Sequence, residues 1–586
     1  MDTIVYDLSS QSEASPNIFI KKDWISILDN NNGIYSSNQS VIDTSQFSNS
    51  NKWINYREAY FTIPMFLTLT QTTTGSVNFT PNTAASSCDY ALGLKNWYGS
   101  IIHSFSVDLA GTTIIQQTPF QGLWNTFKLM TTLSYQDLLI IGPSIGFYPD
   151  NSSSWFYSNT NATTTDFAGK GVCNNFNAIS NPVVSGALNA LEVTNNGLYQ
   201  RQRAWNWNNL GLSGPNGVAL SNMISQQNLQ LIYKSTILPP VDGTAGPLKG
   251  YWAAQIVGQV YLRHLHEFFD KIPLVKGMFM KMTMNLNNSS TQVTITEAAG
   301  NNAANMTQSL ANSSFPLGGI NPIMVASGAA NNGAARVVSV NSAVVTIATS
   351  LFVGSIAYET NAVAAGVPRG YVNNLTLSAP CYTFNPAFEG AYLSNAIRKI
   401  DYEDIYQYQI INIATGQNFN NLITNGIAGI KSVLVLPFHS AAAQATSAQF
   451  NGLISPLQSC FDTAGGGTTS PLTYLNNFNV VISGQNAIYN TQRYTYEQFL
   501  NQLNGQNSLN GNQIDGMGSG LISQMDFENC YNYYYVNVER CLPIEKGVSK
   551  SVSIVGQNVS LWAIDLYVFV SYSVSVNINI LLGSRV

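Results

Sequence analysis

Alternating apolar and polar side chains mark the clearest predicted strands. Between residues 570 and 580 every even position is apolar and every odd position is Ser or Asn. The even positions are Val570, Tyr572, Val574, Val576, Ile578 and Ile580. Residues 278–286 repeat the pattern with four methionines and a leucine. A period of two is what a strand with one buried face requires, so both stretches are predicted to be strands of an all-β fold with brief helices.

A change of period precedes the second strand. The apolar positions there are Leu265, Phe268, Phe269 and Ile272. Their spacing of i, i+3, i+4 and i+7 predicts a short amphipathic helix with this stripe buried. The opposite, solvated face would then carry His266, Glu267, Asp270 and Lys271. Pro273 and Gly277 separate this helix from the strand that follows.

The same segment contains the main metal-site candidate of the sequence. His266-Glu267-Phe268-Phe269-Asp270 is one residue short of the helical zinc motif H-E-x-x-H, in which the second histidine is essential. Asp270 could serve as an oxygen ligand and His264 as a further one. A single near-motif with no second cluster is weak, however, so we predict a surface helix, no metal site and no cofactor.

Length and composition suit a large protein that makes extensive contacts. The chain has 586 residues, more than one hydrophobic core normally serves, so two or more domains are expected. Hydrophobic residues make up 45% and charged residues only 9%, against roughly 25% in ordinary soluble proteins. Because permanent interfaces favour aromatic residues and deplete charge, this composition favours large permanent contacts. It also suits a secreted adhesin.

Charge gives little support for nucleic-acid binding. The net charge is −5, so no global basic field draws the chain onto DNA or RNA. One local candidate interleaves cations with aromatic rings: Arg201, Arg203, Trp205 and Trp207. Such a segment could stack on single-stranded nucleic acid. With only two cations in neutral surroundings, packing or a subunit contact is the preferred interpretation, and no specific nucleic-acid partner is predicted.

Several features predict synthesis in a reducing cytosol. The first ten residues lack the basic and apolar regions of a signal peptide. Six cysteines, at 88, 173, 381, 460, 530 and 541, lack C-x-x-C spacing and are expected to be free thiols. The glycosylation sequons, including those at Asn78, Asn151, Asn305 and Asn558, are expected to be unmodified. The uncharged run 337–358 fits strands better than a membrane span.

Motifs of catalysis are missing from the sequence. Gly465-Gly466-Gly467 is followed by threonines and has no P-loop lysine, and no G-x-S-x-G nucleophile motif occurs. The glycines at 516, 518 and 520 are interpreted as a flexible connection. His103 and His439 are interpreted as lone polar residues on strands rather than general bases. We therefore predict no enzymatic activity and no catalytic residue.

Two elements recur at a constant offset along the chain. Residues 105–111 and 478–484 share the pattern F-x-V-x-[LI]-x-G, and 484 − 111 = 373. The preceding strands, which contain Pro64 and Pro437, differ by 437 − 64 = 373 as well. A helical pattern follows each copy: Leu123, Phe127 and Met130 in the first, and Tyr496, Phe499, Leu500 and Leu503 in the second. Repetition at one offset predicts two copies of a β-domain.

The duplication divides the chain into three parts. We expect an N-terminal arm at 1–50, a first domain with long insertions at 51–385, and a second domain at 386–586. Polar or small-residue segments at 150–200, 288–335 and 462–470 are expected to be long loops, which in compact β-domains usually make contacts or carry function.

These elements, in this order, resemble the double jelly-roll major capsid proteins of the virophage, polinton-like virus and adintovirus group. The resemblance covers most of the chain. It is carried by EAYFTIPMFLTLT (58–70), GLKNWYGSIIHSFSVDLAGTTIIQQTPF (93–120), FKLMTT (127–132), IGFYPD (145–150), NGLYQRQ (196–202), LHEFFDKIP (265–273), NFNVVISG (477–484) and YYYVNVER (533–540). It implies two tandem jelly-roll β-sandwiches with apical loops.

Assembly and partners follow from this resemblance as expectations. It implies a homotrimer of pseudo-hexagonal outline that tiles the icosahedral shell of a double-stranded DNA virus. Neighbouring trimers, a penton protein and minor capsid proteins would be its partners, and the virion capsid its location. The alternative is an extracellular carbohydrate-binding or adhesive β-sandwich, because jelly rolls also serve as lectins. A signal peptide, paired cysteines or an acidic calcium-binding cluster would favour that alternative.

Overall fold

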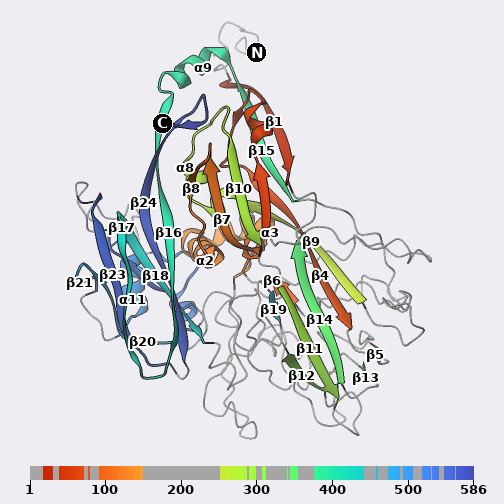
Figure 1. Ribbon diagram of the computed structural model, residues 1–586, viewed down its shortest axis with the longest axis vertical. Coiled ribbons are helices and arrows are strands. Elements are labelled where there is room, and N and C mark those ends of the chain that lie inside the picture. The colour runs from red at the N-terminus through yellow and green to blue at the C-terminus, as the bar shows by residue number, and fades with distance from the viewer. Residues whose placement is uncertain are drawn as a thin grey trace, which may run out of the picture.

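A computed structural model gives the architecture of the chain. It describes residues 17–30, 39–71, 77–78, 92–94, 96–149, 251–286, 289–297, 306–311, 339–340, 344–353, 375–440, 457–459, 473–488, 493–505, 518–529, 531–539, 545, 547–560 and 563–586. Two β-sandwiches stand side by side in Figure 1, with α9 (Pro386–Leu393) at the top between them. We call them the first and the second unit.

Two antiparallel sheets form the first unit. One contains β1 (Phe19–Leu28), β15 (Thr376–Phe384), β4 (Tyr60–Gln71) and β9 (Tyr251–Tyr261), in that spatial order. The other contains β2 (Gln39–Asp43), β10 (Met280–Leu286), β7 (Ile102–Leu109) and β8 (Thr112–Ile115). Counted along the chain as first to eighth, the strands are ordered 1-8-3-6 and 2-7-4-5. This is the double Greek-key order of a jelly roll.

The second unit repeats this order strand for strand. Its larger sheet contains β16 (Ile397–Ile413), β24 (Ile564–Asn579), β18 (Ile430–His439) and β22 (Tyr534–Asn537). Its smaller sheet contains β17 (Asn418–Ala428), β23 (Ser549–Asn558), β20 (Leu475–Ile482) and β21 (Gln485–Asn486). The orders are again 1-8-3-6 and 2-7-4-5, so the chain is a double jelly roll and the predicted all-β fold class is confirmed.

Further strands extend the first unit. β3 (Trp53–Ile54) pairs with β15, while β14 (Val344–Val353), β11 (Ser289–Glu297) and β12 (Met306–Ala311) continue its larger sheet beyond β4. Short ladders join β5 (Val77–Asn78) to β13 (Ser339–Val340) and β6 (Leu92–Leu94) to β19 (Leu457–Ser459), and β25 (Ser584–Arg585) pairs with β24. The strand prediction for 337–358 is confirmed by β14.

Two expectations about segments need correction. β1 and β2 lie within residues 1–50 and pair with β15 and β10, so the described part of the expected N-terminal arm is built into the first unit. The segment 288–335 was expected to be a loop, but it contains β11 and β12. The expected loops at 150–200 and 462–470 lie outside the described residues. Division of the chain near residue 385 stays a prediction.

The internal repeat is visible in backbone conformation. β7 and β20 hold the same position in their units, and so do β4 and β18. Ala110 and Gly111 after β7 have φ of 49° and 85°, and Ser483 and Gly484 after β20 have φ of 49° and 83°. Positive φ at both central residues defines the tight hairpin turn whose twist matches that of its strands. The predicted offset of 373 thus relates structurally equivalent turns.

Helices follow the fifth strand of each unit. They are α2 (Gln121–Thr132) and, at the corresponding place, α11 (Tyr496–Leu503). The other described helices are α1 (Ser45–Ser48), the 3-10 turn η2 (Tyr98–Ile101), α3 (Tyr135–Ile145), α7 (Leu262–Leu265), α8 (Phe268–Lys271) and α12 (Gln524–Asn529). Buried apolar residues form one cluster that crosses from one unit into the other.

The matched turns provide a test of the repeat. Gly111→Ala and Gly484→Ala should each lower the free energy of unfolding by about 1 kcal/mol, because an L side chain is disfavoured at this φ even though open space surrounds both positions. Gly390→Ala in α9 also meets open space and has no such φ, so it should be neutral or stabilising. Chemical denaturation measures the free energy of unfolding of all three variants. A loss at Gly390 equal to the losses at Gly111 and Gly484 would contradict the assignment of the turns.

Candidate functional site: the junction between the units

Aromatic side chains from α2 pack on the outer face of the second unit's larger sheet. The ring of Phe127 lies 5.2 Å from that of Tyr533 and 5.3 Å from that of Tyr535, measured between centroids. Trp124 lies 6.3 Å from Phe569 on β24. The helical pattern put Phe127 on one face of a helix with Leu123 and Met130, and the side chain is only 1% exposed. The hydrophobic core that contains Phe127 is shared between the two units.

Main-chain groups add directional bonds to this contact. The Thr118 hydroxyl donates to the carbonyl of Ile405 on β16 at 2.9 Å. The amide of Glu403 donates to Glu267 Oε2 of the first unit at 2.6 Å. Since buried backbone groups must find partners, each bond fixes the register between the units as well as contributing energy. The junction therefore behaves as a packed interface with defined orientation.

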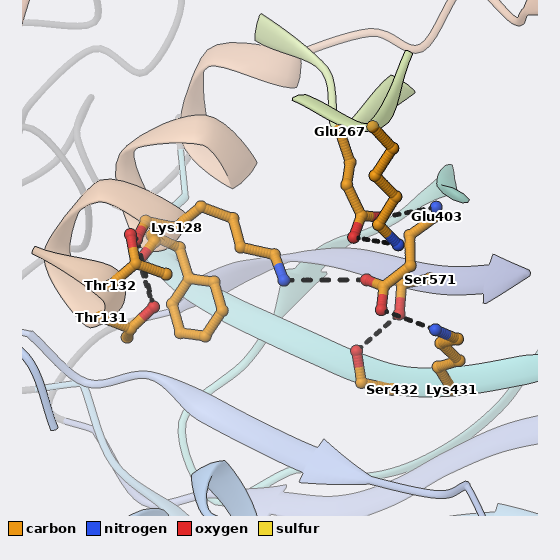
Figure 2. Close-up of polar contacts among 10 residues, drawn as sticks. Lys128, Thr131, Thr132, Glu267, Glu403, Lys431, Ser432 and Ser571 are labelled. Carbon is orange, nitrogen blue, oxygen red and sulfur yellow. Dashed lines mark hydrogen bonds and ion pairs between the residues drawn. The ribbon is translucent and has the colours of Figure 1, made fainter. Parts of the chain in front are cut away.

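Charges gather at the junction in a chain that has few. Glu403 lies between Lys128 of α2, at 3.7 Å, and Lys431 of β18, at 3.1 Å. Glu267 pairs with Lys271 at 2.8 Å beside them. Figure 2 shows the side chains converging from both units on the Glu403 carboxylate. Isolated surface pairs contribute little, but a network at a partly buried boundary is stronger and specifies geometry.

Glu403 is the centre of this network. Its side chain is 22% exposed, and that of Lys431 is 26% exposed. Burial alone would raise the pKa of Glu403, but Lys128, Lys431 and Lys271 together hold it below its ordinary value of 4.5. A carboxylate with a lowered pKa stabilises the folded state above its unfolded pKa. That contribution is lost as the pH falls through the folded value.

The network predicts an acid-dependent effect of mutation. Glu403→Gln should lower the free energy of unfolding by about 1–2 kcal/mol at pH 7, because two lysines lose their partner. As the pH falls below 4.5 and through the lowered folded-state pKa, the difference should shrink, since wild-type Glu403 becomes protonated too. Asp401→Asn, which removes a 60% exposed partner of Lys399, is the matched control and should change little. A loss of unfolding free energy that is the same at every pH would mean that the charge of Glu403 is not its cause.

The near-motif around His266 is arranged differently from its prediction. The stripe is buried as predicted, but the helix breaks at His266, whose φ is −154°, leaving α7 and α8. The prediction that His266 lies on a solvated face is wrong. It is 5% exposed, its Nε2 lies 3.5 Å from Asp404 Oδ1, and its Nδ1 accepts from the Phe268 amide at 3.2 Å. His266 is a further contact between the units.

The other members of the near-motif lie apart from His266. Asp270 is exposed as predicted and pairs with Arg57 at 2.9 Å. His264 is half-buried beside Trp97, with 6.3 Å between ring centroids, and burial lowers its pKa to about 4. Within the described part of the chain, no three His, Cys, Asp or Glu side chains are grouped to hold a metal ion. The absence of a metal stays a prediction.

The remaining candidates are partly visible. His103 of β7 packs on Phe120 with 4.7 Å between ring centroids, and burial lowers its pKa. His439 ends β18. Outside the described residues lie 201–207, which contains the Arg and Trp pairs, and 465–467, the glycine run. The structure therefore tests neither the nucleic-acid interpretation of 201–207 nor the P-loop interpretation of 465–467. Both stay as they were inferred from sequence.

Cysteine and sequon predictions can be placed at two positions. Cys381 is a free, buried thiol on β15, and burial raises its pKa to about 11, which keeps it protonated. The side-chain amide of Asn558 is fully buried and donates to the carbonyl of Ile413 at 2.9 Å. A glycan cannot be accommodated there in the folded chain. The other five cysteines lie outside the described residues, as do Asn151 and Asn305, while Asn78 is in β5.

Sequence reasoning missed the junction itself. Lys128, Glu403 and Asp404 gave no motif, because the partners come from distant parts of the chain. One signal was available, because charged residues are rare in this chain. They make up 9% of it, and the run Asp401 to Asp404 places three acids in one strand. Such a cluster of acids on one strand indicates that cations from another domain lie beside it.

Among the described residues, no helix combines the length and the apolar character needed to cross a membrane.

Comparison with known proteins yields likenesses to solved structures. No family model matches the sequence. Nor does any curated protein match it. A chain of the Sputnik virophage cryo-EM structure has 11% identity, covers 98% of this chain and 90% of that one, and gives a TM-score of 0.45. The mavirus major capsid protein has 9% identity, coverages of 99% and 92%, and a TM-score of 0.38.

The Faustovirus major capsid protein is similar at 10% identity, with coverages of 96% and 91% and a TM-score of 0.40. The resemblance inferred from sequence motifs was to capsid proteins of this architecture. The assignment of a double jelly roll follows from the strand order in the two units.

Proposed function

We propose that this chain is the major capsid protein of an icosahedral double-stranded DNA virus, acting as a structural protein rather than an enzyme. The observation that carries the proposal is the repetition of one jelly-roll strand order, 1-8-3-6 and 2-7-4-5, in two units of a single chain. Two similar sandwiches per chain turn the threefold symmetry of a homotrimer into near-sixfold symmetry. A hexagon is the outline that tiles a flat facet.

The rigid junction supports this proposal. A capsid subunit forms the same contacts with each of its neighbours only if its two units keep a fixed orientation. The aromatic contact of Phe127 and the ion pairs of Glu403 hold them in one arrangement.

Low charge supports the same role. Side faces within and between trimers must lose water, and an unpaired buried charge there costs several kcal/mol. Asn, Ser and Thr can exchange water for neutral hydrogen bonds at much smaller cost. We therefore expect trimer interfaces larger than the ~1,600 Å² of standard complexes. Neighbouring trimers, a distinct protein at the fivefold vertices and minor capsid proteins are the proposed partners, in a virion assembled inside the host cell.

The experiment is a mass and shape measurement on the purified full-length chain. Light scattering and electron microscopy should return a particle of three chains with a hexagonal outline, or a closed shell. A monodisperse monomer at micromolar concentration would remove the capsid proposal. Glycans or three disulfides in the intact mass would instead favour the extracellular carbohydrate-binding or adhesive sandwich, which no described feature singles out.

A further inference from the structure

Asn-Gly pairs are especially open to a reaction of the chain with itself. The main-chain nitrogen that follows the asparagine can attack the side-chain amide carbon, and glycine places no side chain in the way. Both groups belong to neighbouring residues, so proximity favours the reaction. Eight such pairs occur in the sequence. Two of them, Asn425-Gly426 and Asn504-Gly505, lie within the described residues, where the structure determines how free each pair is to react.

The first pair lies in a bulge of β17, the edge strand of the second unit's smaller sheet. The register of β17 against β23 shifts between Thr424 and Ile427. The two residues between them, Asn425 and Gly426, are therefore not paired in the ladder. Both of them are exposed. A β-bulge of this kind leaves an extra residue outside the regular hydrogen bonding of the sheet.

The groups that would react are lightly held in this bulge. The Gly426 amide donates to the Thr424 hydroxyl at 3.4 Å, which is long for a hydrogen bond. The Asn425 side chain has no hydrogen-bond partner among the residues that the structure describes. A Cβ built on Gly426 would meet no atom within 4 Å, so open space surrounds this position. The bulge therefore leaves the pair accessible to solvent and free to rearrange.

The second pair is held by its surroundings. Asn504 follows α11 as its C-cap, and its side-chain nitrogen donates to the Leu500 carbonyl at 2.7 Å and to the Gly518 carbonyl at 3.5 Å. The Gly505 amide donates to the Gln502 carbonyl at 3.2 Å, and Gly505 is buried. Attack would require both groups to give up these bonds. The same dipeptide is thus open at one place in the fold and held at the other.

We propose that Asn425 is a site of spontaneous deamidation in the folded chain and that Asn504 is protected from it. The Gly426 main-chain nitrogen loses its proton to solvent and bonds to the Asn425 side-chain carbonyl carbon, which expels the amide nitrogen as ammonia. Water then adds to the resulting cyclic imide and opens it. Opening at one carbonyl gives aspartate, and opening at the other gives isoaspartate, in which the main chain runs through the side-chain carbon. Water is the only co-reactant.

The product changes a surface that carries few charges. A neutral amide becomes a carboxylate, so the net charge goes from −5 to −6. Isoaspartate also lengthens the main chain, which the bulge accommodates because these residues lie outside the ladder. Since charge on an edge strand opposes pairing with other chains, the edge of β17 should pair less readily as the protein ages. This modification depends on local geometry alone, and it goes beyond the proposed capsid role without requiring it.

The test follows both asparagines in the full-length chain at mildly alkaline pH. Peptide mass spectrometry after digestion measures each site separately from the six Asn-Gly pairs outside the described residues. The chain unfolded in denaturant supplies the intrinsic rate of each site. Folding should slow Asn504 at least about tenfold, because its hydrogen bonds must break before it reacts, and should slow Asn425 by less than that.

Gly426→Ala is the matched variant. Its methyl group would enter open space and the position lacks a positive φ, so the fold should be retained, which circular dichroism checks. The added side chain hinders attack by the main-chain nitrogen and should slow the reaction of Asn425 at least about tenfold.

Three results together support the proposal: Asn425 reacts faster than Asn504 in the folded chain, isoaspartate is among its products, and Gly426→Ala slows it. The proposal is overturned by an Asn425 that reacts in the unfolded chain but stays intact in the folded one. It is equally overturned by an Asn425 that reacts no faster than Asn504, or by a folded Gly426→Ala variant that reacts at the wild-type rate.

Discussion

Replacing Phe127 by alanine should lower the free energy of unfolding by about 3–5 kcal/mol, the range for a fully buried phenylalanine. The ring is 1% exposed and packs on Tyr533 and Tyr535 of the other unit. The cavity left by the substitution would lie between the units rather than within one of them. We therefore expect the units to lose their fixed orientation before either sandwich unfolds.

Two measurements separate this result from ordinary core damage. Calorimetry should show one transition in the wild type and two in the variant, because the units no longer unfold together. Limited proteolysis should increase between β15 and β16, where α9 connects the units. Leu139→Ala, at a 57% exposed position in α3, is the control and should alter neither readout. A single transition shifted to lower temperature would mean that Phe127 stabilises one common core only.

Local patterns predicted the elements whose environment is local. β10 was predicted because burial alternates along the whole strand, and β24 because burial alternates at its carboxyl end, over residues 575–579, which makes side-chain type alternate with the pleat. The repeat at offset 373 was detectable because a turn with positive φ at Gly111 and Gly484 constrains residue type strongly.

β1 was missed for the opposite reason. It pairs only with β15 in the described sheet, and its outer face carries Lys22 beside exposed Trp24. Charge and aromatic residues on one face hide the period of two, so the segment was assigned to an arm. A strand at the edge of a sheet often carries charge, since charge blocks unwanted pairing with other chains.

The junction could not be predicted, because it depends on tertiary placement. Lys128 and Glu403 are 403 − 128 = 275 residues apart, and nothing in either segment identifies the other. His266 was placed on a solvated face because the helical period was extended through it. In the folded chain the second unit covers this position, and burial beside Asp404 replaces solvent. Helical periodicity describes one element and contains no information about a second domain that packs on it.

The interpretation of the glycines at 516, 518 and 520 also lacked information about tertiary placement. They were interpreted as a flexible connection from composition alone. Gly516 lies outside the described residues, but Gly518 and Gly520 do not. Gly520 lies against the carboxyl end of α2, where the Leu521 amide donates to the Met130 carbonyl at 2.8 Å. Glycine here allows close approach of two main chains from different units, which is a structural requirement rather than flexibility.

Gly520→Ala should therefore be among the most destabilising single changes in the chain. A Cβ at this position would lie 2.4 Å from the Met130 carbonyl oxygen and 2.6 Å from the Thr131 carbonyl carbon, both of them main-chain atoms, and φ is +65°. Relief requires α2 to move away from the second unit, so we expect a loss of about 3 kcal/mol or more from overpacking and backbone strain combined.

Gly518→Ala is the matched control for this change. It lies two residues away, its new methyl group would enter open space, and the position lacks a positive φ, so its effect should stay within about 0.5 kcal/mol. Chemical denaturation at pH 7 gives both values, and near-ultraviolet circular dichroism reports the aromatic contact of Phe127 with Tyr533 and Tyr535. Equal stability of the two variants would mean that the close approach at Gly520 does not hold the units together. A large loss confined to Gly520→Ala, with a changed aromatic signal, would assign the effect to the junction.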